Sequence, residues 1–168
     1  SRLDDSLRFE AGTIGALDTP AVWANAFDEA VGPGDIHAVV ALHACDTATD
    51  EALALGVELQ ADFIGAVPCC QSELARAWAT LADEEVPGAF APVWSSNHLR
   101  REAAATMTDT LRMVLLRSCG YDVTAMEFVS SSHTPKNTLL RARRGGADRE
   151  RARREYAELK VVLGGASI

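Results

Sequence analysis

The chain has 168 residues and a mass of 17.9 kDa, enough for one domain with a hydrophobic core and too little for two ordinary domains. Hydrophobic residues make up 48% of it, which excludes disorder as the main state, and its apolar runs are too short to span a bilayer. The net charge of −8 disfavours non-specific nucleic-acid binding by the chain as a whole.

The charge is distributed unevenly along the chain. From Lys136 to the end there are nine basic and four acidic residues, a net charge of +5, and the rest of the chain carries −13. Such a basic arm is compatible with RNA binding. It is more often a solvated helix face with Glu–Arg pairs, and we prefer that interpretation.

Two features bear on the compartment. The first five residues lack the basic and apolar regions of a signal peptide. The chain has four cysteines, of which Cys69 and Cys70 are adjacent, and this is no disulfide scaffold. Both features favour a reducing, cytoplasmic location.

Strand-like and helix-like segments alternate in the first half of the chain. Residues 7–11 predict a short strand closed by Gly12, and a helix over 20–30 begins after Thr19 with Pro20 in its first turn. The continuous apolar runs over 36–42 and 61–67 predict two strands buried on both faces. Between them, the capping-box spacing of Thr47 and Asp50 predicts a helix that runs to residue 59.

The second half begins with further helices and ends with a pair of strands and a basic helix. A helix is expected to begin at Ser72, followed by a loop over 83–97 and a long helix over 99–118. Residues 123–129 and 138–142 predict two strands close enough to form a hairpin, and 148–163 predicts a basic amphipathic helix. This order indicates an α/β fold with a mostly parallel sheet and one antiparallel edge. We place a domain over 1–145 and a basic helix and tail over 146–168.

Polar residues follow the two buried strands at the points where they end. His43, Cys45 and Asp46 follow the first strand, and Cys69 and Cys70 follow the second. Ligands bind at the carboxyl ends of strands in such sheets, so these residues are candidates for a site. His43 and the cysteines suggest a zinc or thiol enzyme, but adjacent cysteines chelate one ion poorly and no thiol-hydrolase signature is present. We therefore assign no metal. Asp46 and Asp50 are alternatively helix caps.

Three segments together resemble one family. The stretch 39–53, with its Leu-His-Ala-Cys-Asp motif, resembles the fourth-strand segment of a group of class I S-adenosylmethionine-dependent methyltransferases. The stretch 66–71, with Pro-Cys-Cys, is similar to the group's next strand end, and 133–140 resembles the turn into its last strand. The resemblance covers about residues 7–160. It implies a Rossmann-like, doubly wound sheet and a methyltransferase that uses S-adenosylmethionine.

The resemblance also implies roles for individual residues. Gly12, Thr13 and Ile14 would approach the cofactor's adenine, and residues 43–45 (His43, Ala44, Cys45) would line the cofactor and methyl-transfer cleft. Its substrate side would be formed by Asp46, Pro68, Cys69 and Cys70, and its closing side by His133, Lys136 and Asn137. If the acceptor carries a proton, Asp46 or His43 would remove it.

The chain departs from the family at its start. The glycine-rich cofactor loop and the acidic ribose-binding residue of such enzymes are not found, so the chain resembles the C-terminal two-thirds of the fold without its first two strands. We expect this chain alone to be inactive and to bind the cofactor weakly or not at all. RNA is the favoured acceptor, with the basic arm contributing to binding. The alternatives are a non-catalytic methyltransferase-like binding module and, less favoured, a zinc or thiol enzyme. A homo-oligomer covering the exposed sheet edge is also expected, and no membrane partner.

Overall fold

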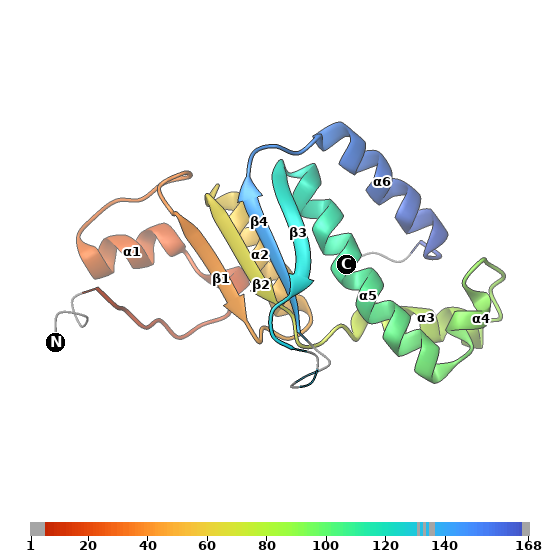
Figure 1. The fold of residues 1–168 in the computed structure, drawn as a ribbon. Coiled ribbons are helices and arrows are strands. Elements are labelled where there is room, and N and C mark those ends of the chain that lie inside the picture. Colours follow the sequence, from red (N-terminus) through yellow and green to blue (C-terminus); the bar gives the residue numbers. More distant parts are fainter. Residues whose placement is uncertain (1–5, 131, 133, 135–136, 166–168) are drawn as a thin grey trace.

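The structure is a computed structural model that describes residues 6–130, 132, 134 and 137–165. Four strands and six α-helices follow one another in a mixed order (Figure 1), with a short 3-10 helix, η1, ahead of them. In chain order they are η1 (Ile14–Ala16), α1 (Thr19–Phe27), β1 (Ala38–Leu42), α2 (Thr47–Glu58), β2 (Phe63–Val67), α3 (Glu73–Asp83), α4 (Ala91–Trp94), α5 (Asn97–Ser118), β3 (Tyr121–Glu127), β4 (Thr138–Arg144) and α6 (Arg149–Val162).

The four strands form one sheet in the order β1-β2-β4-β3. β1 and β2 are parallel, with Leu42 opposite Val67, and β4 is antiparallel to both of its neighbours. Three of the four strands therefore run in the same direction, and β4 is inserted between β2 and β3. The predicted α/β class and the C-terminal hairpin are confirmed.

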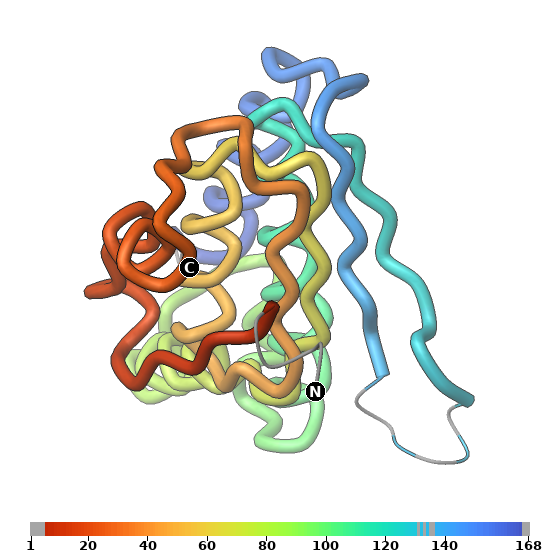
Figure 2. Tube along the Cα trace, turned by 90° about the vertical axis from the view of Figure 1, so that its left-hand side faces the viewer, coloured from red at the N-terminus to blue at the C-terminus, as the bar shows by residue number. Residues whose placement is uncertain are grey.

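One face of the sheet is covered by helices and the other is open in the described residues (Figure 2). α2 contacts β1 and β2, and α5 contacts β3 and β4, on the same side. The core on this side includes Leu53, Ile64, Leu116, Tyr121 and Val123. Helices on the second face, which a doubly wound sheet requires, remain a prediction.

A second core lies between the helices beyond the sheet. It is built by α3, α4, α5 and α6 around the buried Trp78 and Trp94, with Leu74, Leu111 and Leu163. The indole nitrogen of Trp78 donates a hydrogen bond to the carbonyl of Leu163 at 3.1 Å, which fixes the end of α6. The basic helix predicted over 148–163 thus packs on α5 as part of the same body.

Four expectations from the sequence are wrong. Residues 7–11 are exposed and form no strand. β1 is not buried on both faces, since Val40 and Leu42 are 61% and 58% exposed. The reason is its place at the sheet edge, where nothing among the described residues covers its outer face.

Two helices also differ from what the sequence predicted. The predicted loop over 83–97 contains the short helix α4. In addition, α1 ends at Phe27 rather than residue 30, because Asp28 adopts a left-handed φ of 54°.

Candidate functional site

The carboxyl ends of β1 and β2 lie side by side, as the sequence predicted. Their register brings Leu42 opposite Val67, and the backbone amide of His43 donates to the Val67 carbonyl at 3.3 Å. The segments 43–46 and 68–71 therefore leave the sheet at the same edge. This pairing brings together residues that are more than twenty positions apart in the chain.

The backbone between β1 and α2 is unusual. His43 and Asp46 both have positive φ angles, 57° and 47°, which side-chain-bearing residues rarely adopt. The hydroxyl of Thr49 donates to the carbonyl of Ala44 and holds this turn against the first turn of α2. Backbone strain of this kind concentrates at functional sites. It directs Cys45, which stands between the two strained residues, toward the β2 segment.

Three thiols meet above these strand ends. The Sγ atom of Cys45 is 3.1 Å from that of Cys69 and 3.6 Å from that of Cys70, and the Cys69 and Cys70 sulfurs are 3.8 Å apart. All three cysteines are free thiols. The hydrogen bond with Cys69 raises the pKa of the Cys45 thiol, so Cys45 is no activated thiolate in this state.

The carboxylate of Asp46 caps the start of α3 from a distant part of the chain, although Asp46 itself stands at the N-cap position of α2 and Ser72 at that of α3. Its Oδ1 accepts hydrogen bonds from the backbone amides of Ser72 and Glu73 at 3.0 and 3.3 Å, and its Oδ2 accepts from the Ser72 hydroxyl and from Arg76. Partial burial alone would raise the pKa of this carboxyl, but the bonds from Ser72, Arg76 and Glu73 lower the pKa below its ordinary value. A carboxylate with four donors is a poor proton acceptor.

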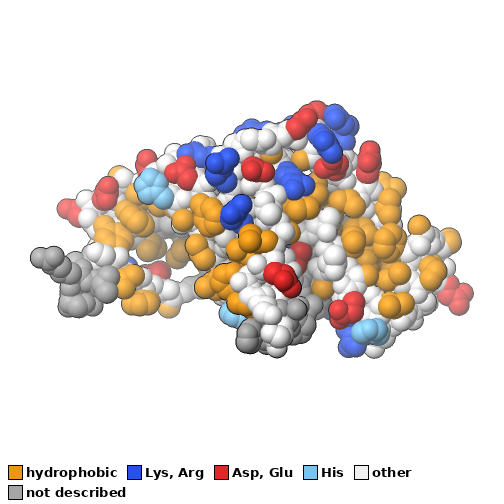
Figure 3. Space-filling view, in the orientation of Figure 1, with side chains coloured by type: hydrophobic (Ala, Val, Ile, Leu, Met, Phe, Trp, Pro, Cys, Tyr) orange, Lys and Arg blue, Asp and Glu red, His pale blue; other side chains and the backbone are white. Residues whose placement is uncertain are grey.

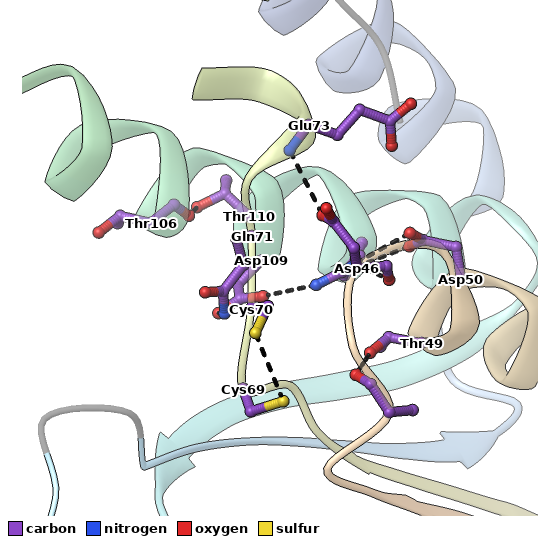
Figure 4. A network of polar contacts seen from close by, with 12 residues as sticks. Asp46, Thr49, Asp50, Cys69, Cys70, Gln71, Glu73, Thr106, Asp109 and Thr110 are labelled. Carbon is purple, nitrogen blue, oxygen red and sulfur yellow. Dashed lines mark hydrogen bonds and ion pairs between the residues drawn. The ribbon is translucent and has the colours of Figure 1, made fainter. Parts of the chain in front are cut away.

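A buried ionic network lies beneath the strand ends (Figure 4). The guanidinium of Arg112, from α5, binds the carboxylate of Asp50 at 2.7 and 2.9 Å, the carboxylate of Asp109 at 3.2 Å and the backbone carbonyl of Asp46 at 3.0 Å. Burial lowers the pKa of Arg112, but Asp50 and Asp109 more than offset this and raise it. Asp109 in turn accepts a hydrogen bond from the Gln71 amide at 3.0 Å. The network links α2, α5 and the segment after β2.

A cavity of about 270 Å³ opens next to this network. Pro68 and Gln71 line it on one side, and Thr106, Asp109 and Thr138 line it on others. Gln71 is only 8% exposed, and its amide oxygen has no hydrogen-bond partner. A buried acceptor without a partner is uncommon, and here it is shielded from solvent beside the cavity.

The other residues singled out by the sequence are placed differently. Asn137 is buried in the hairpin, where its amide donates to the carbonyl of Val129 at 2.8 Å, a structural position. His133 and Lys136 lie outside the described residues. Gly12 and Thr13 are exposed ahead of η1, and the amide of Gly15 donates to Glu51 of α2 at 3.1 Å.

Sequence reasoning missed Arg112, Asp109 and Gln71. The signal for Arg112 was its place as the one charge within the apolar stretch 111–116. A basic residue inside a helix core stripe needs a buried partner, and Asp109, three residues earlier on the same helix, is the one partner that the sequence places near it.

Comparison with known proteins bears on the N-terminal part of the chain. Residues 2–77 match a family model described as a methyltransferase domain, and this match supports a methyltransferase family for that part. The matched range contains both strand ends of the site. Comparisons with curated proteins and with solved structures gave no match. The four-stranded mixed sheet is compatible with a methyltransferase-like fold. Across the described residues, each helix falls short of the length and apolarity that crossing a bilayer requires.

Proposed function

We propose that this chain is an S-adenosylmethionine-dependent methyltransferase domain whose reacting groups lie at the carboxyl ends of β1 and β2. The observation that carries the proposal is the family match over 2–77, which spans the motifs after both strands. The register of β1 with β2 supports it, because that register joins the two motifs into one polar strand-end site.

The cofactor fits the described residues in part. By resemblance it would be held by Gly12, Thr13 and Ile14 together with residues 43–45. Both segments reach α2, the first through the bond of Gly15 to Glu51 and the second by leading into the helix. Residues 43–45 offer a polar strand end to the methyl-bearing end of the cofactor. Gly12 forms no cradle, however, because nothing lies within 4 Å of a Cβ placed there. When bound, the cofactor supplies an electrophilic methyl group.

The chain's own residues would position the acceptor and accept its proton. Asp46 and His43 were the two candidate bases. Four donors occupy the Asp46 carboxylate, whereas the His43 side chain is exposed at the end of β1. We therefore assign the base to His43, and Asp46 becomes a positioning residue that joins the β1 end to α3. Methyl transfer otherwise depends on an in-line approach, which positioning provides.

A nucleobase is the acceptor that the cavity beside Gln71 favours. The aspartate and threonine side chains on its walls would accept hydrogen bonds from an exocyclic amine. The volume of about 270 Å³ limits the group that enters to roughly the size of one base. This favours RNA over a bulkier acceptor such as a folded protein surface.

The basic part of the chain offers a path for an RNA backbone. On α6, Arg151 pairs with Glu155, and Arg153 and Arg154 lie near Glu150, so this helix resembles the solvated face that was the commoner interpretation. Arg141 and Arg143 of β4 are exposed on the open face of the sheet instead, where Figure 3 shows basic side chains above an apolar area. We place the RNA contact there.

Transfer of a labelled methyl group from S-adenosylmethionine to RNA, protein and small-molecule acceptors tests the proposal. Because this chain alone is expected to be inactive, we expect label in RNA when the upstream cofactor loop is supplied, and His43→Ala should then lower its rate by about 10²-fold or more at saturating acceptor. His98→Ala is the matched control, because His98 is an exposed residue at the start of α5 and should change nothing. Absence of both transfer and cofactor binding in calorimetry would contradict the proposal.

A non-catalytic binding module is the second candidate. The open surroundings of Gly12 favour it, because a loop with no neighbouring atoms within 4 Å offers a cofactor few contacts. RNA binding that is independent of S-adenosylmethionine, without methyl transfer, identifies this alternative. Arg141→Ala and Arg143→Ala should then each reduce the slope of log affinity against log salt by about one, whereas the paired Arg154→Ala should change it less.

A further inference from the structure

Three sulfur atoms from two separate segments form a triangle at the carboxyl edge of the sheet. They belong to Cys45, Cys69 and Cys70, and their separations are 3.1, 3.6 and 3.8 Å. Among the described residues, these three cysteines place their potential metal-ligand atoms within 4.8 Å of one another. Neither the methyl transfer proposed above nor the helix capping by Asp46 uses them as a group.

The backbone explains why adjacent cysteines point the same way. In a strand, neighbouring side chains point to opposite faces, which is why the sequence argued against a shared ion. β2 ends at Val67, however, and residues 68–72 follow as irregular chain before α3. There Cys69 and Cys70 turn their sulfurs to the same side. On the other segment, the positive φ of His43 and of Asp46 presents Cys45 to them.

We infer that Cys45, Cys69 and Cys70 form a binding site for one thiophilic metal ion, with Zn²⁺ as the ion that the geometry favours. Zinc bound by thiolates has Zn–S distances of about 2.3 Å, which places tetrahedral sulfur ligands about 3.8 Å apart. Two of the three separations are already close to this value. The third separation, between the Cys45 and Cys69 sulfurs, has to increase by about 0.7 Å, and rotation of the side chains can provide this.

Binding would convert three thiols into three thiolates. The ion displaces one proton from each sulfur, so one Zn²⁺ bound releases three protons and the site carries a net charge of −1. The chain's overall charge of −8 favours a cation. Among the described residues the group offers three ligands, and Cys45 and Cys70 are exposed, so the fourth position of the tetrahedron faces solvent. Open positions of this kind are typical of zinc that binds an exchangeable ligand.

Titration of the reduced protein with Cd²⁺ and Co²⁺ tests the site directly, because thiolate charge-transfer absorption reports sulfur bonded to metal. We expect absorption that saturates at one ion per chain and is displaced by Zn²⁺. Cys45→Ser, Cys69→Ser and Cys70→Ser should each lose it. Cys119→Ser is the matched control, since Cys119 is an exposed free cysteine at the end of α5 outside the group, and it should bind as the wild type does.

Alkylation followed by mass spectrometry gives a second readout that does not depend on absorption. Zn²⁺ should protect the three clustered cysteines and leave Cys119 reactive. The inference is overturned if the reduced protein shows no thiolate absorption, if the Cys119→Ser variant loses as much binding as the others, or if the three cysteines react equally with and without Zn²⁺. A Cys45–Cys69 disulfide that forms in air, in a protein that binds no metal when reduced, would identify a redox pair instead. None of these outcomes depends on methyl transfer.

Discussion

Arg112 and Asp50 form a two-point ion pair between α5 and α2, with Nε to Oδ1 at 2.7 Å and Nη2 to Oδ2 at 2.9 Å. The Arg112 side chain is 1% exposed, so its charge is held in place by partners rather than by water. Breaking a buried pair by removing one partner leaves the other charge uncompensated. The pair therefore fixes the position of α2, and with it the strand-end segment that leads into α2.

Replacing Arg112 with Met should lower the stability of the folded chain. Met preserves much of the volume but leaves Asp50 and Asp109 without their cation, and we expect a loss of about 3–5 kcal/mol in the free energy of unfolding. Urea denaturation followed by circular dichroism measures it. Arg101→Met on the exposed side of the same helix should cost under about 0.5 kcal/mol. Equal losses in the two variants would show that the ion pair contributes nothing.

Asp46→Asn should weaken the junction between β1 and α3. Loss of the charged cap of α3 is expected to cost about 1–2 kcal/mol at neutral pH. The pKa of the folded Asp46 is lowered, so its contribution is fully present above the unfolded value of 3.8 and is lost as pH falls through the folded pKa. Wild type and variant should therefore converge in stability below that pH. A gap that is constant from neutral to strongly acidic pH would contradict this assignment.

Gly56→Ala tests the close packing of α2 on β2. A Cβ at Gly56 would stand 2.7 Å from Cδ1 and 2.8 Å from Cγ1 of Ile64, which is buried. Although Ala favours the helix, we expect a net loss of about 1–3 kcal/mol from overpacking. Ile64→Val removes Cδ1 and keeps Cγ1, so the double variant should recover only the part of this loss that Cδ1 causes. Gly12→Ala, with open space around it, is the control and should be neutral.

The open edge and outer face of β1 should make the chain self-associate. β1 pairs only with β2 in the described sheet, and Val40 is exposed on its uncovered side. Edges of this type pair with another chain unless a charge blocks them. Sedimentation velocity should show concentration-dependent association that Val40→Lys removes. Val161→Lys, at a position 79% exposed on α6, should leave association as it is. A monomer at every concentration would exclude this interface.

The sequence predicted the positions of the long helices and of the two parallel strands better than it predicted burial. The apolar runs over 36–42 and 61–67 look alike, yet β2 is buried and β1 is half open, because burial depends on what covers a strand. A short-range pattern carries no information about that cover. The hydrophobic stripe and the spacing of caps are local, and for that reason α5 and α6 lie within two residues of where they were expected.

The candidate site shows the same division. The sequence located the strand-end residues and suggested Asp46 as either a base or a cap of the helix that follows it. The structure makes it the cap of α3 instead, twenty-six residues further on. No local pattern reveals a partner at that distance. The same is true of the pairing of Arg112 with Asp50 of α2, and of the three sulfurs, whose meeting depends on the irregular chain after β2.

The insertion of β4 between β2 and β3 has a consequence for synthesis. The strand that joins the two sides of the sheet is the last of the described strands, and its ladder to β2 spans about 80 residues of sequence. Until residue 144 has left the ribosome, β2 and β3 have no bridging strand, and their hydrogen-bonding groups stay open. Loop closure over such a distance is slow, so the nascent chain is exposed to mispairing for longer than a chain of local contacts. Completion of the sheet should therefore wait for residues 138–144.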